Sequence, residues 1–113
     1  MSATQVNGFE QSRTDGARWG RLVESAVGAH LLNSTAGSNV EITYWRESGM
    51  EVDFVLQRGA SIVALEVKSG APRMARSGLA AFRKEFSPRS AMLIGEGGMP
   101  LHEFFESDPK DWL

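Results

Sequence analysis

The sequence predicts an α/β domain in which helices pack on a small mixed sheet. Three observations favour this class. Apolar residues recur at helical spacing over residues 16–32. Three runs within residues 40–69 alternate between apolar and polar side chains. A helix-compatible segment and a short apolar run follow over residues 72–95. The expected order is therefore α-β-β-β-α-β, a sandwich of helices around the sheet.

Length and composition restrict the chain to one domain of ordinary size. It has 113 residues, of which 42% are hydrophobic, and it contains no cysteine. This content supports a single core and excludes disulfides and thiolate metal sites. We expect a flexible N-terminal segment over the polar residues 1–15 and a single domain over residues 16–113. Without a long apolar run or a leader, the sequence predicts a soluble, cytoplasmic protein with no membrane partner.

Charge is distributed unevenly along the chain. The net charge of −2 argues against nucleic-acid binding over the whole surface. The charged residues of the segment 96–111, however, are mainly acidic, whereas residues 68–89 carry cations opposed by the single acid Glu85. The basic segment is therefore a candidate for contact with phosphates. Its cations are Lys68, Arg73, Arg76, Arg83, Lys84 and Arg89.

The first helix is expected over residues 16–32, with Thr14 or Asp15 as its N-cap. Glu24 lies between Gly20 and Gly28, four residues from each. Each helical glycine costs about 1 kcal/mol relative to alanine. The pair therefore indicates that another element packs closely against this ridge. The apolar stripe of the helix consists of Trp19, Leu22, Val23, Ala26, Val27, His30 and Leu31.

Three strands are expected over residues 40–46, 51–57 and 61–69. The short turns between them contain Gly49 and Gly59, which predicts two antiparallel hairpins. In the second strand, alternation groups Val52, Phe54 and Leu56 on one face, opposite Glu51, Asp53 and Val55.

The register of the two hairpins brings polar residues together. Counting back from the turn at Gly59 places Asp53 opposite Glu66. The same count from the turn at Gly49 places Tyr44 opposite Asp53. Directly opposed residues share a face, with Cβ atoms about 4.5–5.5 Å apart. A slip of one residue would break both alignments.

The second helix is expected over residues 72–86, because Pro72 suits a first helical turn and Pro88 stops the helix. Residues 90–95 form a short buried strand. Since a helix precedes this strand, we expect it to join the sheet in parallel. Four residues near the C-terminus predict a short helix and a packing tail. They are Leu101, Phe104, Phe105 and Trp112.

The pattern with the most chemical content is Glu66-x-Lys68 on the third strand. Strand alternation puts both side chains on one face, roughly 6–7 Å apart. Aspartate is depleted in strand interiors, so Asp53 needs a partner, which could be Lys68, Arg46 or a metal ion. The simpler readings are a surface ion pair between Glu66 and Lys68, worth at most about 1 kcal/mol, and a solvated Glu24.

These elements, in this order, resemble the PD-(D/E)XK nuclease superfamily, whose fold is restriction-endonuclease-like. They are similar in particular to the uncharacterised C-terminal domain of many prokaryotic AAA-type ATPases, over roughly residues 16–95. A Walker lysine motif is missing, so we expect a free-standing copy, a gene on a mobile element or an excised domain. The resemblance is carried by Gly20-Arg21-Leu22-Val23-Glu24, Tyr44-Trp45-Arg46, Val52-Asp53-Phe54-Val55 and Leu65-Glu66-Val67-Lys68-Ser69-Gly70.

The resemblance implies a divalent-metal-dependent nuclease that hydrolyses DNA phosphodiesters. Asp53 and Glu66 would bind Mg²⁺ or Mn²⁺, together with the backbone carbonyl of Val67. Lys68 would orient the attacking water or stabilise the charge that develops on the phosphate. Glu24 would reach the site from the first helix, directly or through a water molecule. These four side chains are the candidate catalytic residues.

Further residues and two other functional classes complete these expectations. Tyr44 would support the site from the first strand. A catalytically silent domain could instead serve as a protein-interaction or homodimerisation module, with an ATPase acting in trans as one candidate partner. A non-catalytic nucleic-acid binder is the other alternative. The residues expected to contact phosphates, which set affinity rather than sequence preference, are Arg73, Arg76, Arg83 and Lys84.

Overall fold

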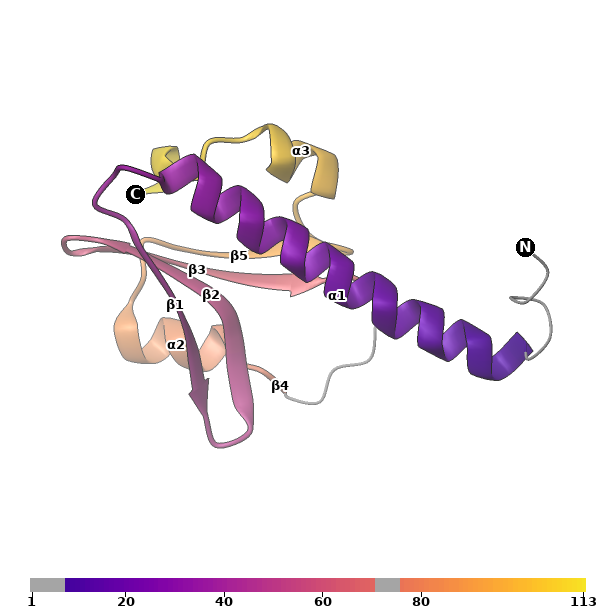
Figure 1. The fold of residues 1–113 in the computed structure, drawn as a ribbon. Helices are drawn as coiled ribbons and strands as arrows, with labels where there is room; N and C mark the ends of the chain where they lie inside the picture. The colour runs from indigo at the N-terminus through magenta and orange to yellow at the C-terminus, as the bar shows by residue number, and fades with distance from the viewer. Residues whose placement is uncertain (1–7, 71–75) are drawn as a thin grey trace.

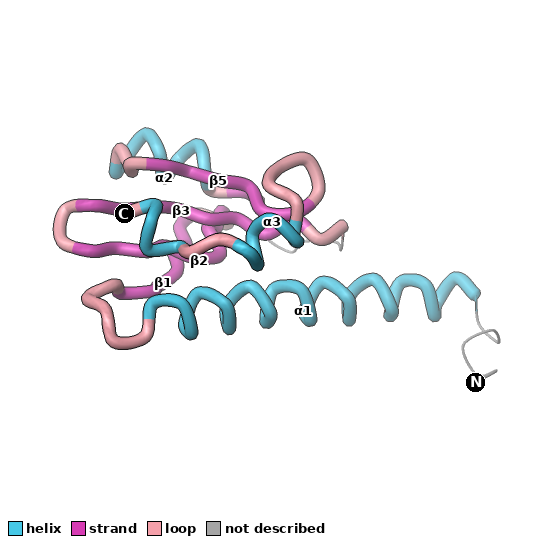
Figure 2. Tube along the Cα trace, turned by 90° about the horizontal axis from the view of Figure 1, so that it is seen from above, coloured by secondary structure: helices cyan, strands magenta, loops and turns pink. Residues whose placement is uncertain are grey.

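A long helix crosses one face of a mixed sheet and a short helix covers the other face (Figures 1 and 2). The computed structural model describes residues 8–70 and 76–113. The predicted α/β class and the small mixed sheet are confirmed. The elements are α1 (Gly8–Thr35), β1 (Glu41–Glu47), β2 (Met50–Arg58), β3 (Ser61–Lys68), β4 (Arg76–Ser77), α2 (Leu79–Phe86), β5 (Ser90–Gly95), α3 (Leu101–Glu106) and η2 (Pro109–Trp112).

The sheet has the order β1-β2-β3-β5, and β4 pairs with β2 outside this path. Both predicted hairpins are antiparallel, and their turns contain Gly49 and Gly59 at positive φ. Strand β5 pairs with β3 in parallel, as predicted, because α2 returns the chain to the same end of the sheet. In the described part of the chain, no helix has both the length and the apolar character needed to span a bilayer.

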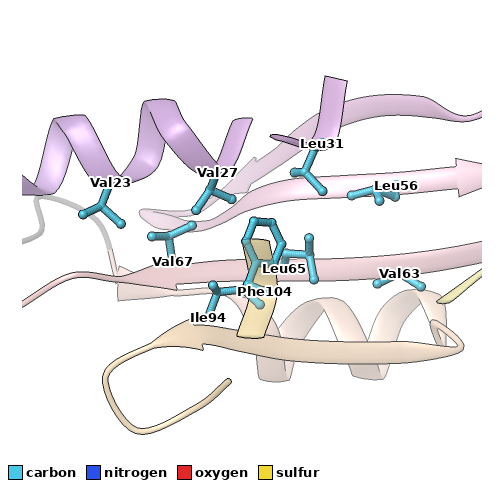
Figure 3. Close-up of a cluster of buried hydrophobic side chains, with 9 residues drawn as sticks. All are labelled: Val23, Val27, Leu31, Leu56, Val63, Leu65, Val67, Ile94 and Phe104. Atoms are coloured by element: carbon cyan, nitrogen blue, oxygen red, sulfur yellow. The ribbon is translucent and has the colours of Figure 1, made fainter. Parts of the chain in front are cut away.

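The larger part of the core lies between α1 and the sheet (Figure 3). From α1, Val23, Val27 and Leu31 point inward at intervals of four residues. Phe104 of α3 is fully buried among them, which confirms the predicted packing tail. His30 joins α1 to the same segment, because its Nε2 lies 2.9 Å from the carbonyl oxygen of Ser107. The remaining members of this α1-side cluster are Leu56, Val63, Leu65, Val67 and Ile94.

A second cluster lies between the sheet and α2. The ring of Phe82, from α2, contacts Trp45 of β1 edge to face, with ring centroids 5.7 Å apart. Trp45, Ile62 and Leu79 are partly buried against this cluster. Its buried members are Val52, Val55, Ala64 and Phe82. The sheet is therefore covered on both faces, and the apolar strand residues of the two clusters divide between the α1 side and the α2 side.

Helix α1 is longer than predicted and its buried stripe is narrower. It begins at Gly8 rather than residue 16, so Thr14 and Asp15 lie within the helix and do not cap it. Trp19 and Leu22 are 55% and 58% exposed, because only one line of residues faces the sheet, and the N-terminal half of the helix extends past the sheet (Figure 1). Residues 1–7 of the expected flexible segment lie outside the described residues, and that expectation stays a prediction.

The second helix is shorter than predicted. It begins at Leu79, and Arg76 and Ser77 form β4 instead, while residues 71–75 lie outside the described residues. Strand β4 takes the edge of β2 that β3 has left, and Gly78 N donates to Glu51 O at 2.9 Å. A Cβ at Gly78 would lie 2.7 Å from Trp45 Cζ3. Residues 76 and 77 thus form a strand rather than a helical turn, because they pair with the backbone hydrogen-bonding groups that β3 leaves unpaired on β2.

Candidate functional site

Strands β2 and β3 separate at the position predicted to hold the carboxylates. Their pairing runs from Arg58↔Ser61 to Phe54↔Leu65 and then stops. The predicted register is confirmed, and one further step along it brings Asp53 level with Glu66. Here the ladder is replaced by a side chain, because Val67 N donates to Asp53 Oδ2 at 2.8 Å. We call this divergence of β2 from β3 the fork.

Asp53 also lies in a β-bulge, which is formed between β2 and its other neighbour, β1. Trp45 pairs with Val52, but Thr43 pairs with Val55, so Asp53 and Phe54 together oppose the single residue between the two pairs. That residue is Tyr44. Tyr44 therefore lies opposite Asp53, as predicted, but it also lies opposite Phe54, which is the extra residue of the bulge. A bulge turns a side chain away from its regular direction and is frequent beside active sites.

The bulge changes which residues of β2 share a face. Val52 and Val55 both belong to the α2-side cluster, whereas Phe54 and Leu56 pack on the α1 side. The predicted grouping of Val52, Phe54 and Leu56 is therefore wrong. The extra residue shifts the alternation by one position, and nothing in the local sequence marks the place where this happens.

Glu66 is the buried carboxylate of the fork. Its exposed fraction is 6%, and its Oε1 has no hydrogen-bond partner among the described residues. Leu65 and Val67 belong to the α1-side cluster, so alternation turns Glu66 and the exposed Lys68 together toward the other face. A buried carboxylate oxygen without a partner is costly. The buried position of Glu66, on the α2 side of β3, is therefore a place where a cation or a donor would be stabilised.

The main chain of Val67 also faces the fork. In a strand, the N–H and C=O of one residue point to the same edge. Because Val67 N donates to Asp53, its carbonyl points toward the same side, whereas Lys68 O accepts from Glu96 N at 3.0 Å on the β5 side. The Val67 carbonyl is thus directed toward β2, on the side of the fork where Asp53 lies.

This donor set fits a hard divalent cation. Asp53, Glu66 and Val67 supply oxygen atoms only, which Mg²⁺ and Mn²⁺ prefer, and Mg²⁺ usually takes one or two carboxylates together with water and substrate phosphate. Within residues 8–70 and 76–113, no three His, Cys, Asp or Glu side chains are grouped closely enough to hold a metal ion. Glu24 therefore does not join the other two carboxylates in a three-ligand cluster.

Glu24 lies instead along a groove between α1 and β2. A Cβ at Gly28 would lie 3.3 Å from Phe54 Cζ, which confirms that another element packs closely against the glycine ridge. The role of Glu24 at the metal stays a prediction. The groove has a volume of about 540 Å³ and is lined by Arg21, Glu24, Ser25, Gly28, Ala29, Leu32 and Phe54.

The expected phosphate contacts do not lie on one helix. Arg76 is exposed in β4, where its Nη2 donates to Ser48 O at 3.3 Å. Arg83 and Lys84 are exposed in the last turn of α2, and Arg83 Nη2 lies 3.3 Å from Ala91 O. Arg73 lies outside the described residues. The cations that can be placed are thus distributed over β4 and α2.

Two features of the site were missed from the sequence. The guanidinium carbon of Arg46 lies 5.4 Å from the centroid of the Tyr44 ring; their spacing of two residues on one strand was the available signal. Gly95 has φ +107°, and a Cβ there would lie 2.2 Å from Lys68 O. This glycine lets β5 approach the end of β3 that carries Lys68, a contact that is visible only in the folded chain.

One comparison with known proteins identifies the chain. No curated protein and no solved structure matches it. Residues 19–104 match the family described as "Domain of unknown function (DUF4143)", whose members are often found with AAA ATPases, in agreement with the predicted association. Because this match spans most of the 113 residues, the chain belongs to the DUF4143 family.

Proposed function

We propose that this protein is a divalent-metal-dependent nuclease of the PD-(D/E)XK type that hydrolyses DNA phosphodiesters. The observation that supports the proposal most is the buried Oε1 of Glu66, which lacks a hydrogen-bond partner among the described residues, beside Asp53 at the fork. An uncompensated carboxylate in the interior costs free energy. Structures keep such groups where a ligand compensates them.

Three groups of the protein at or beside the fork would hold the cation. Asp53 is fixed by the 2.8 Å hydrogen bond from Val67 N to its Oδ2. The backbone carbonyl of Val67 and the carboxylate of Glu66 would add further oxygen ligands. When bound, Mg²⁺ or Mn²⁺ would polarise a phosphate and lower the pKa of a water molecule. Orienting the water molecule and binding the phosphates would then depend on the side chains around these ligands.

Lys68 is the group that would act on the phosphate. It is exposed, and strand alternation directs it to the same face as Glu66. Its ammonium would orient the attacking water or stabilise the charge that develops on the phosphoryl oxygens. Glu24 is proposed to assist through a water molecule. Arg76, Arg83 and Lys84, with Arg73, would bind the phosphates that flank the cleaved bond.

Calorimetric titration with Mn²⁺ tests the proposal. Wild-type protein should bind the ion, and the double variant Asp53→Asn with Glu66→Gln should not. Glu85→Gln, which removes an exposed carboxylate from α2, is the matched control and should bind like wild type. Lys68→Met should retain Mn²⁺ and lose cleavage of DNA. If the wild type does not bind Mn²⁺, either alone or with a short DNA duplex present, the proposal of a metal-dependent nuclease is refuted.

One observation favours a second function, that of a catalytically silent interaction module. Trp19 and Leu22 of α1 are more than half exposed, and Leu32 is 62% exposed. Exposed apolar side chains on one helix suit a protein partner, such as an ATPase acting in trans or a second copy. Sedimentation of the wild type and of the double variant Trp19→Ser with Leu22→Ser tests for a second copy as the partner. A wild-type dimer that the double variant does not form would identify this helix as the dimer interface. Salt-sensitive DNA binding without cleavage would instead identify a non-catalytic nucleic-acid binder.

A further inference from the structure

Strand β1 leaves one edge of the sheet open. The order β1-β2-β3-β5 makes β1 and β5 the two edge strands. The edge of β5 is partly covered, because Met99 N donates to Leu93 O at 2.9 Å and Gly95 N donates to Met99 O at 2.7 Å. Within the described residues, no segment pairs with the outer edge of β1. Such an edge is a template on which another strand can pair.

The hairpin shows which backbone groups of β1 face this open edge. Glu47 and Met50 flank the two-residue turn and pair with each other, so the backbone groups of Glu47 point toward β2. Alternation along the strand then directs the N–H and C=O groups of Ile42, Tyr44 and Arg46 outward. Strand β1 contains neither the proline nor the lysine that often protects an edge. Its outward backbone groups are therefore available to a further strand.

Exposed aromatic side chains lie on both faces of the sheet at β1. Ile42 packs on the α1 side, so alternation places Tyr44 on that side too, where it is 66% exposed. On the α2 side, Phe86 is 41% exposed, and its ring centroid lies 6.5 Å from that of Trp45. Exposed apolar area that gathers in one place marks interaction surfaces. A strand added beside β1 would meet apolar area on both faces.

The residues of β1 restrict how a second copy of the chain can pair with it. A two-fold axis perpendicular to the sheet keeps every side chain on its own face, so two antiparallel copies of β1 must centre on one residue. A centre at Tyr44 would oppose Glu41 of each copy to Glu47 of the other. Directly opposed like charges are destabilising. The neighbouring centres that avoid this repulsion are Thr43 and Trp45.

A centre at Thr43 gives the better set of opposed residues. Thr43 then faces Thr43 of the other copy, and Ile42 of each copy faces Tyr44 of the other. Thr–Thr pairs and aromatic–β-branched pairs both stabilise antiparallel strands. This centre also opposes no two acidic residues. A centre at Trp45 would instead oppose Tyr44 to the charged Arg46 and leave the ring without an apolar partner.

We propose that β1 is a dimerisation edge, at which two copies of this chain pair antiparallel about Thr43. A second copy fits the edge because the strand supplies its own complementary residues, Thr43 for itself and Ile42 for Tyr44. One continuous sheet runs through both subunits of this dimer. The inference does not depend on the nuclease proposal, and it assigns the dimer to β1 rather than to the exposed side chains of α1.

Single cysteines test the pairing and its register, because the chain contains no cysteine of its own. At the Thr43 pair, which is not hydrogen-bonded, the Cα atoms should lie about 4.5 Å apart, within the range that a disulfide spans. Diamide should therefore convert Thr43→Cys into a covalent dimer. Glu47→Cys, also exposed but far from the axis, is the matched control and should cross-link at least about tenfold more slowly. Equal rates for these two variants, or a faster rate for Tyr44→Cys, would overturn the proposal.

Sedimentation velocity supplies a second readout without cross-linking. Wild type should form a dimer as its concentration rises toward about 1 mM. Thr43→Lys, which places two cations at the axis, should weaken the dimer about tenfold, whereas Thr43→Val keeps a β-branched residue and should dimerise like wild type. Thr43 is exposed, so both variants should keep the wild-type Tm.

Three outcomes of the sedimentation experiment would contradict the proposed edge. The first is a wild type that stays monomeric over the whole concentration range. The second is a Thr43→Lys dimer as stable as that of wild type. The third is a dimer that the double variant Trp19→Ser with Leu22→Ser no longer forms, since this result would place the second copy on α1.

Discussion

Replacement of Glu66 by methionine should make the metal-free protein more stable. Glu66 is buried, and its Oε1 lacks a hydrogen-bond partner among the described residues. Leaving a buried polar atom unsatisfied costs about 1–3 kcal/mol. Methionine has a similar length and no polar group that needs hydration. The free energy of unfolding of Glu66→Met should therefore exceed that of wild type by about 1–3 kcal/mol.

Thermal unfolding with and without Mn²⁺ measures both parts of this prediction. For a domain of about this size, 1 kcal/mol moves Tm by about 4 °C or somewhat more, so metal-free Glu66→Met should melt about 4–12 °C higher. A metal at a hundredfold excess over its Kd stabilises the folded state by about 2.7 kcal/mol. Wild type should thus gain about 10 °C with Mn²⁺, and Glu66→Met should gain nothing.

Ser61→Ala is the matched control. The Oγ of Ser61 is the other buried side-chain atom without a partner in the described part of the chain, and it lies at the opposite end of β3. Its removal should raise stability slightly and leave the Mn²⁺ shift unchanged. The reasoning would be refuted if Glu66→Met melted below wild type without metal, or if its Tm still rose with Mn²⁺ as the wild-type Tm does.

Three further predictions follow from contacts at and around the fork. Asp53→Asn keeps an acceptor for Val67 N and should change unfolding by less than about 1 kcal/mol, whereas Asp53→Ala should cost about 1–3 kcal/mol in urea denaturation; equal costs would contradict the hydrogen bond. Gly28→Leu should destabilise by about 1–3 kcal/mol, since a Cβ already lies 3.3 Å from Phe54 Cζ; an unchanged urea midpoint would show that the helix can move away. Gly95 has φ +107°, and a Cβ at this position would lie 2.2 Å from Lys68 O. Gly95→Ala should therefore lower the free energy of unfolding by at least about 2 kcal/mol. A soluble Gly95→Ala variant with the wild-type Tm would disprove the close approach.

Most elements were predictable because their signals are local. Alternation and glycine turns located β1, β2 and β3, a short apolar run located β5, and the count from Gly59 gave the register of the second hairpin. The membership in an ATPase-associated family was also carried by short motifs in a fixed order. Asp53, Glu66 and Val67 were expected at one place on the sheet, and the structure brings Asp53 and Val67 into contact there.

The features that were mispredicted depend on competition between distant segments. Helical periodicity over residues 72–86 gave one long helix, but the unpaired edge of β2 takes Arg76 and Ser77 into β4. The predicted apolar stripe of α1 included Trp19 and Leu22, which are more than half exposed. The sequence of the helix does not show how much of its length and width the sheet covers. The bulge at Asp53 is invisible locally, since either register of β1 is compatible with the same residues.

The sequence by itself determined the fold class, the order of the elements and the identity of the candidate residues, because periodicity, turn residues and side-chain chemistry are properties of neighbouring positions. The tertiary structure decided how those residues meet. The fork that lets Asp53 accept a hydrogen bond from Val67, the burial of Glu66 and the exposure of Tyr44 beside the bulge arise from which strand edge pairs with which. Such pairings are settled by hydrogen-bond satisfaction and packing over the whole sheet, so they cannot be read one segment at a time.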